Sequence, residues 1–233
     1  MNIITNESLI KRNARIGQVA MLAGLGVLGG GMYLSYKNPE LFSLSIGALI
    51  VGFLLSQIGI YYSNRWGRRP RPDEMLDKSL KGLDKKYTIY HYSSPASHLL
   101  LGPAGVWVLI PRHQGGTITY SNGRYRQKGG NLYLKIFAQE GLGKPETEIF
   151  AEQDAVAKFL QKHLPEDKLP DIRSALLFTN PKSIVEVSSE ENPPAETIPI
   201  NKLKDLIRKE AKSKHLSQEK VEELDNVFFK RTI

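Results

Sequence analysis

The chain carries two long uncharged stretches, IGQVAMLAGLGVLGGGMYLSY at residues 16–36 and LFSLSIGALIVGFLLSQIGIYY at residues 41–62. At about 1.5 Å per residue, each stretch forms a helix of roughly 30 Å, which matches the hydrocarbon core of a bilayer. Only Lys37-Asn38-Pro39-Glu40 joins them, so the two helices must run antiparallel. The sequence therefore predicts a transmembrane hairpin over residues 16–62, with spans at 16–36 and 41–62.

Small residues gather on both predicted helices. Gly26 and Gly30 form one small-xxx-small step, and Ala48, Gly52 and Ser56 form another; such steps let helix backbones approach closely in a membrane. A buried hairpin of a soluble protein is the first alternative, but each of the six glycines in the first stretch would cost about 1 kcal/mol in an aqueous helix. A cleaved signal peptide is the second, but another apolar span follows at once.

Basic residues flank the hairpin on both outer sides. Lys11, Arg12 and Arg15 precede it, and an arginine-rich run at 65–71 follows it. The positive-inside rule then places both termini and the soluble domain in the cytoplasm of a multi-pass protein of the plasma (inner) membrane. We expect residues 1–15 to be a basic cytoplasmic N-terminus, and residues 63–72 to be a basic Pro/Arg linker that meets anionic lipid headgroups.

The charge balance depends on position in the chain. Residues 1–71 hold eight of the 32 Lys and Arg residues and only two of the 24 acids. Most of the net charge of +8 therefore lies beside the membrane, and it is no argument for nucleic-acid binding by the rest of the chain. The absence of cysteine excludes disulfides, thiolate metal sites and cysteine nucleophiles.

The remaining residues suit one α/β domain. Gly102-Pro103-Ala104-Gly105 and Ser121-Asn122-Gly123 are turn signals that predict two β-hairpins. The predicted elements, in chain order, are a helix at 73–86, strands at 87–92, 97–101, 106–110, 117–120 and 124–128, a helix at 146–164, strands at 175–179 and 184–187, an acidic loop at 188–194, and helices at 202–212 and 218–228, the last capped by Ser217. Residues 131–137 favour neither helix nor strand. This order indicates an α/β sandwich with a mixed β-sheet.

The string SHLLLGPAGVWVLIPRHQGG at residues 97–116 resembles the NERD (nuclease-related) domain, a branch of the restriction-endonuclease-like superfamily. The resemblance covers about residues 73–187, and leaves 188–233 as an acidic loop with C-terminal helices. It implies a restriction-endonuclease-like sandwich in which acidic residues of adjacent strands hold Mg²⁺ and a nearby lysine helps to activate water.

This chain departs from the family pattern at each of those positions. The two acidic positions fall on Ser97 and Ile110, and the lysine falls on Arg112. A hydroxyl is a weak magnesium ligand, isoleucine is none, and arginine stays protonated. Residues 85–139 contain no Asp or Glu at all. We therefore expect a degraded motif without catalytic residues, metal or cofactor, in which Arg112 pairs with a carboxylate.

The same acid-free stretch is rich in cations. Alternation along residues 124–128 places three of them on one face of a strand, and Tyr120, Tyr125 and Tyr133 interleave with the basic residues, as a surface for phosphates and unstacked bases requires. The candidate residues for nucleic-acid or anion binding are Arg112, Arg124, Arg126, Lys128 and Lys135. The alternative is a solvated hairpin whose charges pair with acidic helices at 146–154 and 219–225.

Three functions remain open from the sequence. The first is a non-catalytic binding or scaffold module on the membrane, with nucleic acid, an anionic ligand or another protein as partner. The second is an active magnesium-dependent nuclease that uses displaced acids such as Asp73, Glu74 or Glu140. The third is a structural membrane protein that forms homo-oligomers through its glycine-rich helices.

Overall fold

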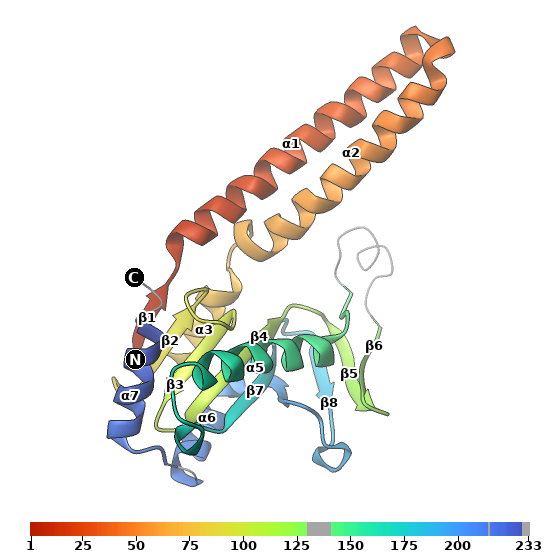
Figure 1. Ribbon diagram of the computed structural model, residues 1–233. Coiled ribbons are helices and arrows are strands. Elements are labelled where there is room, and N and C mark those ends of the chain that lie inside the picture. Colours follow the sequence, from red (N-terminus) through yellow and green to blue (C-terminus); the bar gives the residue numbers. More distant parts are fainter. Residues whose placement is uncertain (130–140, 214, 230–233) are drawn as a thin grey trace. The chain divides into compact units, whose positions relative to one another are not determined.

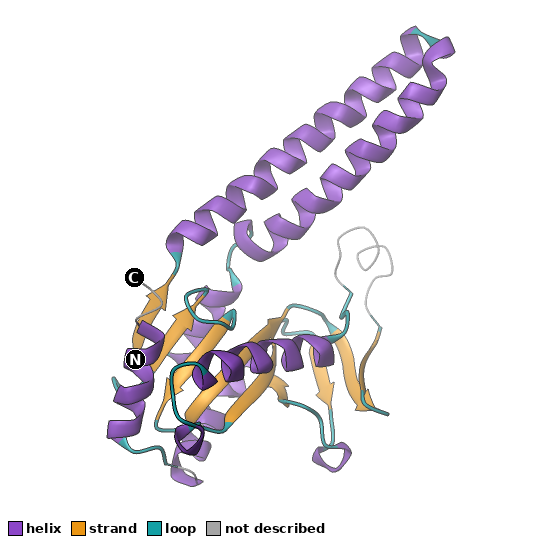
Figure 2. Cartoon of the chain, in the orientation of Figure 1, coloured by secondary structure: helices purple, strands orange, loops and turns teal. Residues whose placement is uncertain are grey.

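The computed structural model describes residues 1–129, 141–213 and 215–229. The chain divides into two compact units, one of residues 7–71 and one of residues 1–6 together with 72–233. The first is a pair of long helices and the second is an α/β domain (Figures 1 and 2). The predicted ambiguous segment 131–137 lies outside the described residues.

The first unit is the helical hairpin. It consists of α1 (Glu7–Lys37) and α2 (Phe42–Tyr62), with a short 3₁₀ turn at Pro39–Leu41 and a π-helical turn at Ser63–Gly67. Both long helices are long and apolar enough to cross a membrane. Only 17% and 11% of their most apolar windows are buried, which argues against the core hairpin of a soluble protein. Helix α1 begins at Glu7, earlier than the apolar stretch itself.

Small residues spaced seven apart form the contact between α1 and α2. Gly17, Gly24 and Gly31 are buried on α1, and Ser45, Gly52 and Gly59 are buried on α2. A Cβ atom added at Gly24 would lie 2.6 Å from Ser56 Oγ, so the backbones touch only because no side chain intervenes. The predicted step Ala48–Gly52–Ser56 lies in this contact. Gly26 and Gly30 do not, since a Cβ atom at either meets nothing within 4 Å.

The second unit is built on a six-stranded mixed sheet. Its elements are β1 (Asn2–Thr5), α3 (Pro72–Leu80), β2 (Thr88–His91), β3 (His98–Gly102), β4 (Gly105–Arg112), β5 (Gly116–Ser121), β6 (Arg124–Lys128), α5 (Pro145–Gln161), a 3₁₀ turn (Glu166–Lys168), β7 (Ile172–Phe178), β8 (Ser183–Glu186), a 3₁₀ turn (Ser189–Glu191), β9 (Glu196–Pro199), a 3₁₀ turn (Ile200–Lys202), α6 (Leu203–Ser213) and α7 (Gln218–Phe229). The strand order is β1-β2-β3-β4-β7-β9. Strand β3 runs antiparallel to β2 and β4, and the other pairs are parallel.

Strand β1 was not predicted. Residues 2–5 pair in parallel with β2, with Ile3 opposite Ile89, so the start of the expected basic N-terminus is an edge strand of the sheet. The four residues carry little local signal, because their partner lies more than 80 residues later in the chain. The hairpin is therefore an insertion between two neighbouring strands of one sheet.

Helices cover both faces of this sheet, which confirms the predicted α/β sandwich with a mixed sheet. On one face α5 and α7 bury Ile149, Leu160 and Phe228 with Val108 and other strand residues; on the other, α3 and α6 bury their leucines around Trp107. Figure 1 shows α5 lying across the sheet. The helix predicted at 73–86 ends earlier, at Leu80, before Gly82 at φ +87°. Strand β9 was not predicted from the sequence.

A smaller sheet, of order β6-β5-β8, extends the first core. Asn122 and Gly123, both at positive φ, make the tight turn predicted between β5 and β6. Ile118, Tyr120 and Tyr125 of this sheet are buried in the first core. The Tyr125 hydroxyl lies 2.8 Å from Thr197 Oγ1 on β9, and burial raises the pKa of Tyr125 to about 12.

The hairpin contact makes a matched prediction. Gly24→Leu should separate α1 from α2, because its side chain would meet Ser56 and the Gly52 carbonyl, whereas Gly26→Leu should not. Since the chain has no cysteine, spin labels on Ile16→Cys and Tyr61→Cys report the helix separation in nanodiscs. A broadened or longer distance for Gly24→Leu alone is expected; equal behaviour of the two variants would contradict the packing.

Candidate functional site

The candidate site lies where several strands of the large sheet end together. Strand β2 ends at His91, opposite His98 at the start of β3, and β4 ends at Arg112, opposite Phe178 of β7. We call this end of the sheet the carboxyl edge. The carboxyl ends of parallel strands are where α/β sheets most often place ligands, and the family motif positions Ser97, Ile110 and Arg112 fall here.

On the side of the sheet that carries α5, two motif positions bind carboxylates of that helix. Ser97 Oγ donates a hydrogen bond of 2.7 Å to Glu152, and its backbone N–H lies 3.3 Å from the same carboxylate. Arg112 forms an ion pair with Glu148. Glu148 and Glu152 are one turn apart on α5, so both point to the same part of the edge. Arg112 therefore pairs with a carboxylate, as predicted.

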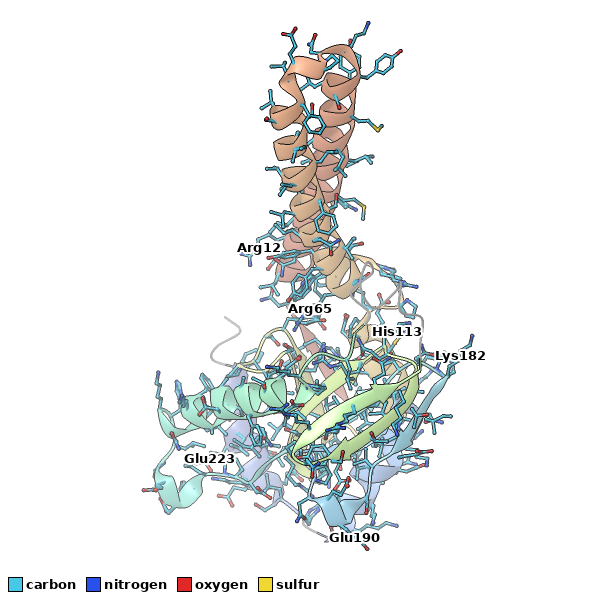
Figure 3. The ribbon with its side chains drawn as sticks, turned by 90° about the vertical axis from the view of Figure 1, so that its right-hand side faces the viewer. Arg12, Arg65, His113, Lys182, Glu190 and Glu223 are labelled. Carbon is cyan, nitrogen blue, oxygen red and sulfur yellow. The ribbon has the colours of Figure 1, made fainter. Side chains whose placement is uncertain are left out.

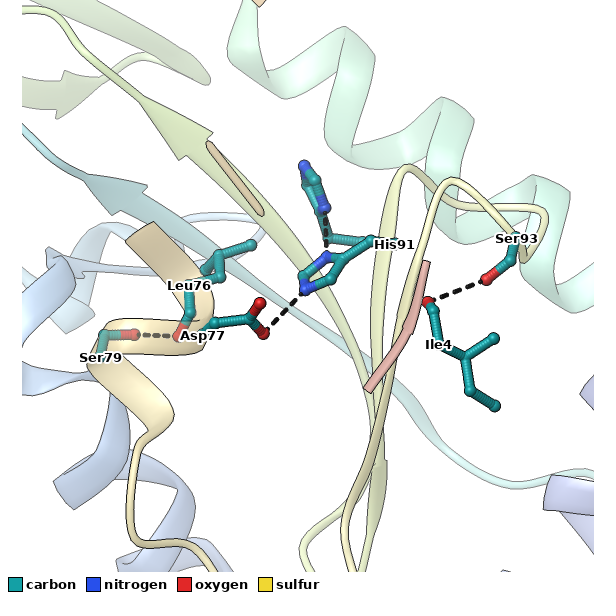
Figure 4. A network of polar contacts seen from close by, with 7 residues as sticks. Ile4, Leu76, Asp77, Ser79, His91 and Ser93 are labelled. Atoms are coloured by element: carbon teal, nitrogen blue, oxygen red, sulfur yellow. Dashed lines mark hydrogen bonds and ion pairs between the residues drawn. The ribbon is translucent and has the colours of Figure 1, made fainter. Parts of the chain in front are cut away.

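On the side that carries α3, a carboxylate and two histidines form a chain (Figure 4). His91 Nε2 lies 3.1 Å from Asp77 Oδ1, and His91 Nδ1 lies 2.8 Å from His98 Nδ1. Both histidines are buried. If the neutral His91 ring donates its Nε2 proton to Asp77, its Nδ1 carries no proton and accepts a hydrogen bond. His98 must then donate that hydrogen bond from its own Nδ1. These hydrogen bonds among Asp77, His91 and His98 join α3, β2 and β3 at the carboxyl edge.

The other predicted acids do not complete a metal site. Asp73 is buried on α3 and Glu74 lies beside it, while Glu140 is outside the described residues. Ile110 is 2% exposed and packs in the first core. Within the ranges that the structure describes, no group of three or more His, Asp or Glu side chains is placed to hold a metal ion.

The cations of β6 are arranged as the alternation predicts. Arg124, Arg126 and Lys128 are exposed, whereas Tyr125 between them is buried. Tyr120 is buried as well, so the prediction that these tyrosines stack with bases is wrong for both. Tyr133 and Lys135 lie outside the described residues.

The β6 cations are exposed, as the alternative of a solvated hairpin also expects, but in the described part of the chain they form no ion pair with α5 or α7. Three acids of these helices pair with other residues, Glu148 with Arg112, Asp154 with Lys158, and Glu223 with Lys168 and Lys220. Arg112 belongs to the carboxyl edge rather than to the β6 surface, because its guanidinium is held by Glu148. The predicted set of binding residues thus divides between two places.

Sequence reasoning missed most of the residues that surround Ser97 and Arg112. Glu148 and Glu152 have a local signal, since carboxylates four apart on a predicted helix share a face. Asp77, His91 and His98 have none, because they lie on a helix and two strands with no spacing rule between them. A cavity of about 440 Å³ at the opposite end of the sheet is lined by acidic and basic side chains together, among them Asp84, Lys85 and Glu222.

Comparisons of the chain with protein-family models, with curated proteins and with solved structures found no match in any of the three. The resemblance of residues 73–187 to the NERD domain therefore stays a hypothesis that rests on the sequence motif.

The ion pair at the edge makes a prediction for stability. Arg112→Met leaves Glu148 without its cation and should cost about 1 kcal/mol, since both side chains are partly exposed (21% and 33%). The double variant Arg112→Met with Glu148→Leu should lose less unfolding free energy than the sum of the losses in the two single variants. Urea unfolding in micelles, followed by Trp107 fluorescence in a Trp66→Phe background, measures this. Additive costs would mean that the pair contributes nothing.

Proposed function

We propose that this protein is a membrane-attached, NERD-related module that binds or organises a partner without catalysing a reaction. The observation that carries the proposal is the ion pair between Arg112 and Glu148. At the position where a nuclease of this superfamily would keep a metal ion beside carboxylates, the chain supplies its own cation. The charge of Glu148 is thus neutralised by the protein itself.

The nuclease alternative requires several changes at once. Magnesium needs oxygen ligands in near-octahedral geometry. Of the carboxylates on α5, Glu148 is held by Arg112 and Glu152 by Ser97, and Ile110 offers no ligand. Arginine also cannot serve as a base, because its guanidinium stays protonated. A working metal site would therefore first have to displace Arg112.

Strand β1 supports an even number of membrane spans independently of charge. Residues 1–6 and 72–233 form one compact unit, so the two ends of the hairpin must lie on the same side of any membrane that it crosses. Two spans satisfy this requirement and one span does not. Together with the basic flanks around residues 11–15 and 65–71, this supports a cytoplasmic domain and a multi-pass protein.

Self-association within the membrane is the second candidate. Gly26, Gly29, Gly30 and Gly47 face away from the α1–α2 contact, and a Cβ atom at any of them meets nothing within 4 Å. A second copy packed there would bring helix backbones close. Nothing described in the structure covers this face, so the glycines are compatible with a homo-oligomer without requiring one.

The function is tested by a cleavage assay on the full chain in nanodiscs. Single-stranded and duplex DNA and RNA, each with Mg²⁺ or Mn²⁺, should remain intact, because the edge holds Arg112 in place of a metal. Asp73→Asn and Glu148→Gln serve as controls, since a contaminating nuclease would be unaffected by either. Metal-dependent cleavage that one of these variants abolishes would overturn the proposal.

The orientation is tested by labelling single cysteines in intact cells. An impermeant thiol reagent should react with Asn38→Cys, in the short loop between the spans, before permeabilisation. It should react with Lys162→Cys, exposed after α5, only after permeabilisation. Labelling of Lys162→Cys in intact cells would mean that the domain lies outside.

A further inference from the structure

The outward face of the small sheet forms a cationic surface that the carboxyl edge does not explain. Strand β6 contributes Arg124, Arg126 and Lys128, all exposed. The register sets Ser121 opposite Arg124, Thr119 opposite Arg126 and Thr117 opposite Lys128. Figure 3 shows this β5–β6 hairpin facing the viewer, with Lys182 labelled beside it. We call these six residues, with the outward residues of β8, the cationic face.

The net charge of the cationic face is positive. Among the described residues, none of Arg124, Arg126 and Lys128 forms an ion pair. Strand β8 adds Ile184, which is 57% exposed, and the acid Glu186. Thr119 of β5 lies opposite both Glu186 and Arg126, and so separates this acid from the cation. Lys182, exposed directly before β8, offsets that one acid. The face is therefore suited to an extended anionic surface.

Its chemistry favours phosphate oxygens over bases. Arg and Lys side chains bind phosphate by charge and hydrogen bonds, and the hydroxyls of Thr117, Thr119 and Ser121 add donors. The aromatic side chains of both strands, Tyr120 and Tyr125, point into the core. Single-stranded nucleic acid usually needs aromatic platforms for its bases, and the described part of this face has none.

The connections to the hairpin keep the domain near the bilayer in any orientation. Only Asn6 lies between β1 and α1, and only residues 68–71 lie between the turn Ser63–Gly67 and α3. An extended chain spans at most about 3.6 Å per residue, so neither connection is long enough for the domain to move far from the membrane. Lipid headgroups are thus the phosphates at the highest local concentration.

We propose that the cationic face docks on anionic phospholipid headgroups of the membrane that the hairpin crosses. The proposal rests on the membrane attachment in the proposed function and adds a site on β5, β6 and β8. The cations bind lipid phosphates, the hydroxyls hydrogen-bond to the same oxygens, and Ile184 reaches the boundary between headgroups and acyl chains. Docking holds the domain in one orientation on the bilayer.

The test uses the full chain in nanodiscs with a fluorophore on Thr119→Cys, the only cysteine in that variant. Nanodiscs contain phosphatidylcholine alone or with phosphatidylglycerol, and both carry a lipid with a nitroxide on its headgroup. We expect strong quenching of the fluorophore only with phosphatidylglycerol. Quenching should disappear at molar salt, where the Debye length falls to about 3 Å.

A charge-matched pair of variants identifies the surface. Arg124→Gln with Arg126→Gln and Lys128→Gln should lower the ratio of docked to undocked protein by on the order of tenfold or more. The control variant, Lys162→Gln with Lys202→Gln and Lys209→Gln, removes the same charge from exposed positions elsewhere. It should change the ratio of docked to undocked protein little. Both triple variants should unfold at the temperature of the parent, because every substituted side chain is exposed.

Three results would overturn the proposal. The first is equal quenching in both kinds of nanodisc, and the second is equal loss of quenching in both triple variants. The third is no quenching, together with salt-sensitive binding of added DNA or RNA that the β6 variant alone loses. The last would assign the face to nucleic acid. None of these outcomes changes the cleavage or labelling results, so failure of lipid docking is distinguishable from failure of the proposed function.

Discussion

The parallel pairing of β1 with β2 is the constraint on which the rest of the structure depends. It joins residues 2–5 to residues 88–91 and turns the hairpin into an insertion within one sheet. Both ends of the hairpin therefore lead into the same folded unit, and the domain is joined to the hairpin by two short connections rather than one. Two connections limit reorientation far more than a single linker would, because each additional connection removes rotational freedom.

The carboxyl edge shows how charged and polar side chains of two helices are held at the ends of the central strands. Carboxylates of α5 and α3 still approach the ends of β2, β3 and β4, but their partners are a guanidinium, a hydroxyl and an imidazole. A partly buried carboxylate must be neutralised or hydrogen-bonded, since an unpaired charge is costly to bury. Here the protein itself provides these partners. The ion pair of Arg112 with Glu148 and the hydrogen bond of Ser97 to Glu152 join α5 to the sheet.

Two properties of the molecule follow from period-two alternation in a single strand. In β6, the residues that face outward are Arg124, Arg126 and Lys128, while Tyr125 faces the first core. The same alternation that concentrates the cations removes the aromatic ring from their surface. Composition alone suggested a surface for nucleic acid, because tyrosines and basic residues are neighbours in sequence. On a strand, however, sequence neighbours occupy opposite faces, and the surface that remains presents cations without the tyrosine rings.

The sequence by itself determined the two long apolar helices, the GPAG and SNG turns with their hairpins, the main helices and strands of the sandwich, and the absence of Asp and Glu from residues 85–139. These features depend on hydrophobic length, turn chemistry and residue identity, all of which are local. Only the tertiary structure decided that residues 2–5 enter the sheet, that Gly24 and Gly52 rather than Gly26 and Gly30 close the hairpin, and that Glu148, Glu152 and Asp77 meet the motif positions and His91. Each of these depends on contacts between residues far apart in the chain, whose free energy appears only once the backbone has brought them together.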